Sequence, residues 1–282
     1  MALDALGLIG FGNIARTLLG VLEEALPGPL GTLAVLVRPE ASRETRRTVT
    51  AALGPGLCRS GSAHVSVDAF VEVLGRGGGA LVVECAGHGA VRTLVPATLA
   101  AGLETVVVSV GALGDEALRR RLRGAAATGR TRLVVPSGAI GALDLVAALR
   151  RSGIESVRYR GRKPPAAWRG TPAEAALDLS ALDAPTVFYE GDARAAVRDY
   201  PANANVAAAL SLAGIGFDDT DVTLIADPSV DGNVHEFDVR AAAGNVSVRI
   251  EGRASPDNPK TSLPTVYSVA REVLNRIEPL VV

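Results

Sequence analysis

The stretch GLIGFGNIA, at residues 7–15, constrains the fold of this chain more than any other segment. It places Gly10, Gly12 and Ala15 in a G-x-G-x-x-[G/A] pattern between an apolar run and an amphipathic segment. The first glycine permits a tight turn, the second lets the backbone approach a pyrophosphate, and Ala15 lets the helix pack closely on the strand. The segment therefore predicts a dinucleotide-binding turn, and we expect Asn13 and Ile14 to contact the cofactor as well.

Short β-branched runs alternate with amphipathic stretches through the first half of the chain. The expected strands are Leu6–Ile9, Thr32–Val37, Leu81–Cys85, Thr105–Val110 and Arg132–Val135. The expected helices are Asn13–Ala25, Arg43–Leu53, Ala90–Ala101 and Asp115–Ala127, and His64 is expected in a polar loop. Repeated strand–helix–strand units predict a Rossmann-type, doubly wound parallel sheet over residues 1–137, so the fold class is α/β.

The second half of the chain has a different pattern. Its expected strands are SVRYRGRK, PTVFYEG, DVTLIAD, HEFDVRAA and NVSVRIEG, with a hairpin at Ala241–Asn245 and one helix near Asn205–Ala213. This pattern predicts an α+β domain with an open mixed sheet over residues 138–254. Residues 255–282 end in a helix, with Ser262 as its N-cap, which we expect to pack back on the first domain.

Composition excludes several classes of function. The formal net charge of −1 gives no electrostatic reason to bind nucleic acid or an anionic membrane, and no apolar run reaches transmembrane length. Cys58 and Cys85 show no CxxC pattern, which indicates reduced thiols in a cytoplasmic protein. Three scattered histidines and these two cysteines do not predict a metal site.

The residues that follow two predicted strands indicate which cofactor could bind and where it would lie. NAD-binding sheets usually place an acid after the second strand for the ribose 2′-hydroxyl, but this chain has Arg38 there. An arginine at this point suits a 2′-phosphate and is equally compatible with a solvated side chain, so both NAD and NADP stay open. Ala86 and Gly87 follow a later strand, and small residues there line the crevice in which a dinucleotide lies. His88 is expected to begin the next helix.

The stretch DGNVHEFDV, at residues 231–239, alternates with the period of a strand. Glu236 and Asp238 fall on one side, while His235 and Phe237 fall on the apolar side. A histidine in that position is either a packed core residue or a proton carrier. Burial lowers the pKa of an imidazole and keeps it neutral, as a base requires, and we expect Asp231 or a backbone carbonyl to orient the ring.

Six motifs occur in a fixed order along the chain: the glycine turn, PSGAIGALD, RKPPAAWRGTPAE, PANANVAAALSLAG, NVHEFDV and NPKTS. Together they resemble the L-aspartate dehydrogenase family of NAD(P)-dependent enzymes, which make iminoaspartate and feed NAD biosynthesis. The resemblance spans nearly the whole chain. One departure is Ala142, where the family often has a second glycine, and small repacking would absorb its methyl group.

The resemblance implies a homodimer with a Rossmann domain and an α+β substrate domain. It implies that His235 acts as acid and base at the substrate. It also implies that the cofactor contacts the glycine turn, Ala139 and Asn205. The substrate would be L-aspartate, or oxaloacetate and ammonia in the reverse direction.

A dicarboxylate substrate requires cations or N–H donors. The cationic candidates, all expected in loops that could line a cleft, are Arg162, Lys163, Arg169 and Lys260. We single out Lys260 and its neighbour Thr261 as substrate ligands, although the same turn could serve only to cap the final helix.

Other interpretations of this pattern remain open. Homoserine dehydrogenase and dihydrodipicolinate reductase share the two-domain plan, and a non-catalytic NAD(P)-binding sensor would share the glycine turn. Sugar and inositol dehydrogenases typically carry Glu-Lys-Pro after a Rossmann strand. The sequence ECAGHGA at residues 84–90 argues against that class.

Overall fold

The computed structural model describes residues 3–75, 79–201, 203–255 and 258–281, with the backbone alone described for 254–255 and 258–261. The chain divides into two compact units. The first comprises Met1–Pro136 and Val266–Val282, and the second comprises Ser137–Thr265. The second unit thus begins one residue before the expected start at residue 138. It ends at Thr265, eleven residues after the expected end at residue 254.

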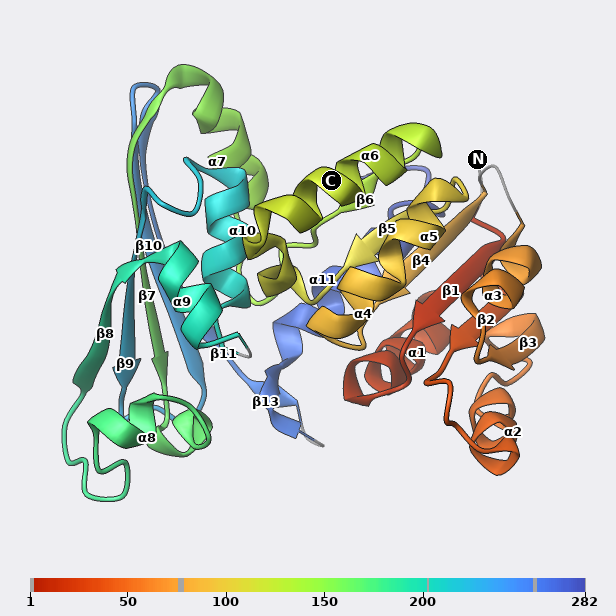
Figure 1. Cartoon of the computed structure of the whole chain (residues 1–282), viewed down its shortest axis with the longest axis horizontal. Coiled ribbons are helices and arrows are strands. Elements are labelled where there is room, and N and C mark those ends of the chain that lie inside the picture. Colours follow the sequence, from red (N-terminus) through yellow and green to blue (C-terminus); the bar gives the residue numbers. More distant parts are fainter. Residues whose placement is uncertain (1–2, 76–78, 202, 256–257, 282) are drawn as a thin grey trace. The chain divides into compact units, whose positions relative to one another are not determined.

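A six-stranded parallel sheet forms the centre of the first unit (Figure 1). Its strands are β1 (Ala5–Ile9), β2 (Leu30–Leu36), β3 (Cys58–His64), β4 (Ala80–Glu84), β5 (Glu104–Val107) and β6 (Leu133–Val134). They lie in the order β3-β2-β1-β4-β5-β6, which is the strand order of dinucleotide-binding Rossmann sheets. The expected α/β fold is therefore confirmed.

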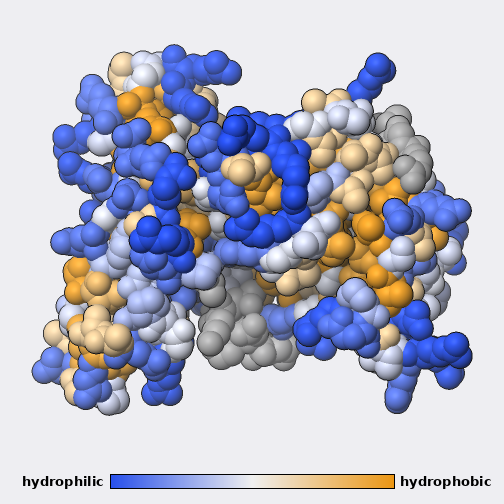
Figure 2. All heavy atoms as spheres, in the orientation of Figure 1, coloured by the Kyte–Doolittle hydropathy of each residue, from blue (hydrophilic) through white to orange (hydrophobic). Residues whose placement is uncertain are grey.

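Helices connect these strands. They are α1 (Asn13–Ala25), α2 (Arg43–Ala51), α3 (Val67–Leu74), α4 (His88–Thr93), α5 (Val95–Ala100), α6 (Glu116–Thr128) and the 3₁₀ turn η1 (Val110–Gly114). α6 buries Leu118 and Leu122, and Figure 2 shows hydrophilic residues over its outer surface. A helix with one apolar stripe and a polar opposite face packs against a sheet in this way.

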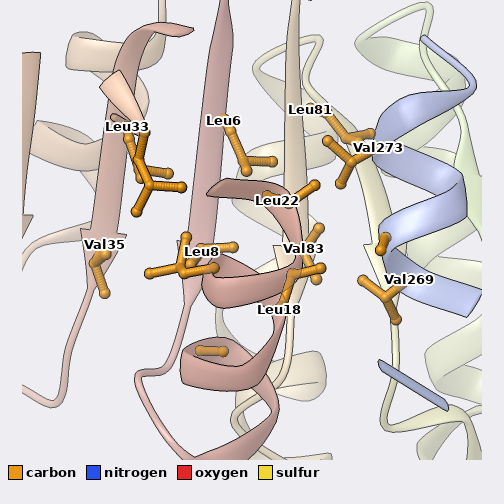
Figure 3. Close-up of a cluster of buried hydrophobic side chains, with 14 of the residues drawn as sticks. Leu6, Leu8, Leu18, Leu22, Leu33, Val35, Leu81, Val83, Val269 and Val273 are labelled. Atoms are coloured by element: carbon orange, nitrogen blue, oxygen red, sulfur yellow. The ribbon is translucent and has the colours of Figure 1, made fainter. Parts of the chain in front are cut away.

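One face of the sheet is covered by α1 together with α11 (Leu263–Leu274), from the C-terminal end of the chain. Leu18 and Leu22 of α1 and Val269 of α11 pack with Leu6 and Leu8 of β1 (Figure 3). Each such side chain contributes about 1.5–3 kcal/mol when it leaves water. The last helix therefore completes the core of the first unit.

Two expectations for the first unit were wrong in detail. His64 is the last residue of β3 rather than part of a loop, because the expected pattern missed the strand CRSGSAH. The single helix expected over Ala90–Ala101 is two helices, interrupted at Leu94. Pro96 has no backbone N–H to donate into the preceding turn, which accounts for the break.

The second unit contains a mixed five-stranded sheet in the order β11-β10-β7-β9-β8 (Figure 1). Its strands are β7 (Ile154–Lys163), β8 (Thr186–Asp192), β9 (Thr220–Ala226), β10 (Asn233–Ala241) and β11 (Gly244–Gly252). β7 runs parallel to β9, and the other pairs are antiparallel. β10 and β11 form the expected hairpin.

The helical segments of this unit are α7 (Leu143–Leu149), η2 (Arg150–Ser152), η3 (Pro165–Trp168), α8 (Ala173–Ala176), α9 (Ala193–Asp199) and α10 (Asn205–Ala213). α9 and α10 pack on the sheet, and α9 was not expected. Two short strands, β12 (Ala254–Ser255) and β13 (Asn258–Ser262), precede α11. Ser262 directly precedes that helix, but within the described chain its buried hydroxyl forms no hydrogen bond, so the expected side-chain cap is wrong.

Candidate active site

The glycine turn lies at the carboxyl end of β1, between the ends of two neighbouring strands. Gly10 donates its amide to Leu36 O at 2.9 Å, and it has a φ of +95°. A Cβ on Gly10 would lie 2.8 Å from the Cβ of Ala86, so the turn and the segment after β4 approach too closely for a side chain. The structure therefore brings Gly10 and Ala86 together, as a shared crevice requires.

Gly12 is the N-cap of α1 and is exposed. A Cβ built there meets no atom within 4 Å. The start of this 13-residue helix is suited to an anion, because the first N–H groups of a helix have no partner within the helix. Asn13 and Ile14 follow in that first turn and are half-buried.

A buried carboxylate shapes the segment after β4, and sequence analysis did not assign it a role. Glu84 is fully buried and accepts hydrogen bonds from the amides of Ala86 and Gly87, both at 2.8 Å. It also accepts from the amide of Ser109 at 3.1 Å and from its hydroxyl at 3.0 Å. Burial raises the pKa of Glu84, although these donors oppose the rise. Glu84 thus fixes the backbone of two predicted cofactor residues.

Arg38 lies two residues beyond the end of β2 and is exposed. Its backbone carbonyl accepts a hydrogen bond from the amide of Ala41 at 3.0 Å, which closes the loop before α2. The residue is therefore placed at the strand end where a ribose contact is expected.

In the second unit, Ala139 is buried and follows a turn in which Gly138 has a φ of +66°. Asn205 is the first residue of α10 and is half-buried. Ala142 has a φ of +60°, a left-handed conformation that favours glycine. Alanine in place of the family's glycine at position 142 thus strains the backbone at the start of α7, whereas a small change in packing was expected.

His235 lies on β10 and is 2% exposed. Phe237 and Val239 on the same face are also buried, which confirms the expected alternation. The Nδ1 atom of His235 lies 2.8 Å from the hydroxyl of Tyr159 on the neighbouring strand β7. Tyr159 thus orients the ring, whereas Asp231 or a backbone carbonyl was expected to do so.

Gly161 makes this hydrogen bond possible. It pairs directly with His235 across the two strands. A Cβ on Gly161 would lie 2.6 Å from the hydroxyl of Tyr159. The missing side chain therefore leaves the space through which Tyr159 reaches the imidazole.

The environment holds both rings in their neutral forms. Burial, aided by the positive charge of Lys163, lowers the pKa of His235 to about 3. Burial raises the pKa of Tyr159 far above its ordinary value of 10.0. Among the described residues, the Nε2 atom of His235 is buried without a hydrogen-bond partner. A neutral imidazole with one unpaired nitrogen can donate to, or accept a proton from, a bound molecule.

Lys163 is the last residue of β7, at the end of the expected strand SVRYRGRK, and is only 7% exposed. Its Nζ donates to Oδ1 of Asn203 at 2.8 Å and lies 5.2 Å from the ring centroid of Trp168. Burial lowers the pKa of this ammonium to about 8. The side chain of Asn203, which follows the lysine by 40 positions in the sequence, thus binds the lysine.

The remaining candidate substrate ligands differ in what the structure describes of them. Lys260 and Thr261 belong to β13, but their side chains lie outside the described part of the chain. Arg169 is exposed, and Arg162 forms ion pairs with Glu236 and Asp227.

Within the described residues, no group of three or more His, Cys, Asp or Glu side chains could hold a metal ion, and no helix is long and apolar enough to span a membrane.

Two family models match the chain. Residues 144–276 match the model described as "Aspartate dehydrogenase, C-terminal". Residues 10–136 match the model described as "Homoserine dehydrogenase, NAD binding domain". The homoserine dehydrogenase description thus applies only to the nucleotide-binding part, while the part that carries His235 matches an aspartate dehydrogenase model.

Relatives match over most of the length. The L-aspartate dehydrogenase of Ralstonia pickettii is 43% identical over 269 residues, which cover 95% of this chain and 96% of that one. That of Pseudomonas aeruginosa is 51% identical over 195 residues, covering 69% and 73%. The crystal structure of aspartate dehydrogenase from Thermotoga maritima superposes with a TM-score of 0.71 at 27% identity, covering 99% of both chains. Dihydrodipicolinate reductase from Paenisporosarcina, at 11% identity and a TM-score of 0.51, shares only the fold.

Proposed function

Because the chain belongs to the L-aspartate dehydrogenase family, we propose that it oxidises L-aspartate to iminoaspartate with His235 as the acid–base residue. As a member of that family, it is an NAD(P)-dependent oxidoreductase that acts on a CH–NH₂ group. The observation that best supports the role of His235 is its buried imidazole, held at Nδ1 by Tyr159 and unpaired at Nε2 among the described residues.

The residues of the first unit fit a dinucleotide. Gly12 is the N-cap of α1, and a Cβ there would meet no other atom within 4 Å. Glu84 fixes the backbone at Ala86 and Gly87. We assign the pyrophosphate to the glycine turn with Asn13 and Ile14, and further cofactor contacts to Ala139 and Asn205 of the second unit. The bound cofactor supplies the acceptor for the hydride that leaves the α-carbon of aspartate.

The proton chemistry follows from the electron count. The α-ammonium group must lose a proton first, because the nitrogen lone pair forms the C=N bond as hydride leaves the α-carbon. His235 accepts that proton at Nε2, in the tautomer whose Nδ1–H donates to the hydroxyl of Tyr159. His235 then releases this proton to solvent. Water adds to the iminium carbon while His235 accepts a proton from that water and passes it to the nitrogen. Ammonia leaves as the carbinol hydroxyl loses its proton, and oxaloacetate forms. The reverse direction aminates oxaloacetate.

We propose two further features from the family resemblance. The first is that iminoaspartate would supply NAD biosynthesis.

The second is that the chain would form a homodimer through the face of the second sheet that bears the charged side chains. On that face Glu236 pairs with Arg162 at 3.1 Å and with Arg249 at 2.7 Å, and a two-fold axis could place such alternating charges opposite one another. Light scattering on the purified chain tests this state, and a monomer mass at micromolar concentration would contradict it.

The test of the function is reduction of NAD⁺ and NADP⁺ at alkaline pH with L-aspartate, L-homoserine, L-malate and sugars. We expect L-aspartate to support turnover far better than the others. A clear rate with another substrate and none with aspartate would refute the proposal. Cofactor binding without any turnover would instead indicate a sensor.

Cofactor preference is tested at Arg38. If its guanidinium binds a 2′-phosphate, Arg38→Ala weakens NADP⁺ binding by about 10- to 100-fold and changes NAD⁺ binding little, as expected for loss of a charge-assisted hydrogen bond. An unchanged ratio of the two affinities would remove Arg38 from the cofactor site.

A further inference from the structure

β7 carries four cations near its end, and they differ in their partners. Three are arginines that form ion pairs: Arg158 with Asp221, Arg160 with Asp238 and Arg162 with Glu236. The fourth, Lys163, is the most buried of the four, and its described partners are both uncharged. Within the described residues, Lys163 forms no ion pair with a carboxylate, and burial lowers its pKa. This strand therefore neutralises its partly exposed cations and leaves the buried one uncompensated.

An uncompensated buried ammonium costs folding free energy, so the fold itself gives no reason to keep it. Asn203 and the ring of Trp168 hold the ammonium without neutralising it, since an amide oxygen and an aromatic face carry no net charge. The described residues therefore leave this ammonium without a counter-charge.

The position of Lys163 relates it to His235. Gly161 pairs with His235 across β7 and β10, and Lys163 follows two residues later on the same face of the sheet. The two side chains are close enough that the charge of Lys163 lowers the pKa of His235. A molecule that reaches the unpaired Nε2 of His235 therefore comes within the field of this ammonium.

We propose that Lys163 binds a carboxylate group of the dicarboxylate substrate beside His235. The assignment deepens the proposed function and rests on it. Burial is the main reason that His235 is a weak proton acceptor, and the positive charge of Lys163 adds to it. A carboxylate on Lys163 would offset this second contribution. Substrate binding thereby strengthens the base when the ammonium of aspartate must be deprotonated.

The test is binding of succinate, a dicarboxylate that cannot be oxidised at an amine. Calorimetry gives its Kd, and the fluorescence of Trp168, the single tryptophan of the chain, reports whether it binds beside Lys163. In Lys163→Met we expect the Kd for succinate to rise about 10- to 100-fold, as for loss of a charge-assisted hydrogen bond, and the fluorescence change to disappear. Arg158→Met, which removes an exposed cation from the same strand, should leave both unchanged.

Kinetics separate this inference from the proposed function. We expect Lys163→Met to raise the KM for L-aspartate more than it lowers kcat, with cofactor affinity unchanged, and Lys163→Arg to recover part of the loss. An unaltered Kd for succinate in Lys163→Met, or no succinate binding by the wild-type chain, would overturn the inference while aspartate oxidation could still stand. Succinate binding that depends on Lys163, without aspartate oxidation, would refute only the proposed function.

Discussion

The hydroxyl of Tyr159 lies 2.8 Å from Nδ1 of His235, and both side chains are buried on one face of adjacent strands. Their rings are nearly parallel, with an interplanar angle of 23° and centroids 6.0 Å apart. Because Nδ1 is engaged, only Nε2 of the imidazole is available to a bound molecule. This pair sets the direction in which His235 can exchange a proton.

Tyr159→Phe removes the hydrogen bond and retains the ring. The loss of one buried hydrogen bond, worth about 1 kcal/mol, should lower kcat for aspartate oxidation roughly 5- to 10-fold as the imidazole loses its fixed tautomer. Steady-state kinetics with cofactor titration measures the effect, and the Kd for the cofactor should not change.

Tyr189→Phe is a matched control for this change. Tyr189 lies on β8 of the same sheet, and its hydroxyl donates to the carbonyl of Asp192 at 2.6 Å. Equal losses of kcat in the two variants would show that the effect of Tyr159 is structural rather than specific to His235.

The two glycines of the turn should respond differently to alanine. At Gly10, a φ of +95° and a contact of 2.8 Å to Ala86 predict that Gly10→Ala lowers the free energy of unfolding by about 1–3 kcal/mol. At Gly12 the space is open, so Gly12→Ala should keep the fold and weaken cofactor binding at least about tenfold. Urea unfolding and fluorescence titration with NADH measure the two effects. Normal NADH binding by Gly12→Ala would show that no pyrophosphate approaches this turn.

Ala142→Gly should stabilise the chain. Alanine at a φ of +60° costs about 1–2 kcal/mol, of which the greater flexibility of glycine in the unfolded chain cancels part. The expected gain is about 0.5–1 kcal/mol in urea unfolding. Ala147→Gly, at an exposed position inside α7, is the control and should lose about 1 kcal/mol. A lower free energy of unfolding in both variants would mean that the left-handed conformation of Ala142 does not destabilise the chain.

The depressed pKa of His235 predicts how stability depends on pH. Its folded value of about 3 lies below the ordinary 6.5, so between these values the unfolded chain binds a proton that the folded chain does not. This contribution to stability is complete above pH 6.5 and is lost as pH falls, by at most about 1.4 kcal/mol per pH unit. Urea unfolding from pH 5 to 7 should show a smaller dependence in His235→Gln than in wild type. Identical slopes would mean that His235 titrates normally in the folded chain.

The fold was predictable where local pattern and packing agree. Asn13–Ala25 and Asn205–Ala213 form helices with the expected bounds, since each follows a clear start and an apolar run. β3 was missed because Ser and Gly dominate CRSGSAH, and such residues have low strand propensity. That strand lies at the sheet edge and pairs only with β2, so pairing rather than composition makes it a strand.

The candidate site was less predictable because its contacts are distant in sequence. The alternation of DGNVHEFDV placed His235 on the buried face, but its partner Tyr159 lies 76 positions away and depends on strand register. Glu84 binds Ser109 across 25 positions, a contact without a local signal. Arg162 and Lys163 are adjacent in sequence yet lie on opposite faces of β7. A shift of one residue in the register of this strand would therefore place Arg162 on the buried face and Lys163 on the opposite one.

The proposed role of His235 as the proton carrier of aspartate oxidation is tested most directly by the kcat of His235→Gln, with cofactor affinity determined in parallel. Phe237→Leu, on the same buried face of β10, controls for disturbed packing. We predict that His235→Gln lowers kcat by about 10²- to 10⁴-fold, the usual contribution of general acid–base catalysis, while the Kd for the cofactor stays within about twofold and Phe237→Leu remains active. A kcat near the wild-type value in His235→Gln would contradict the account and return His235 to the core of the sheet.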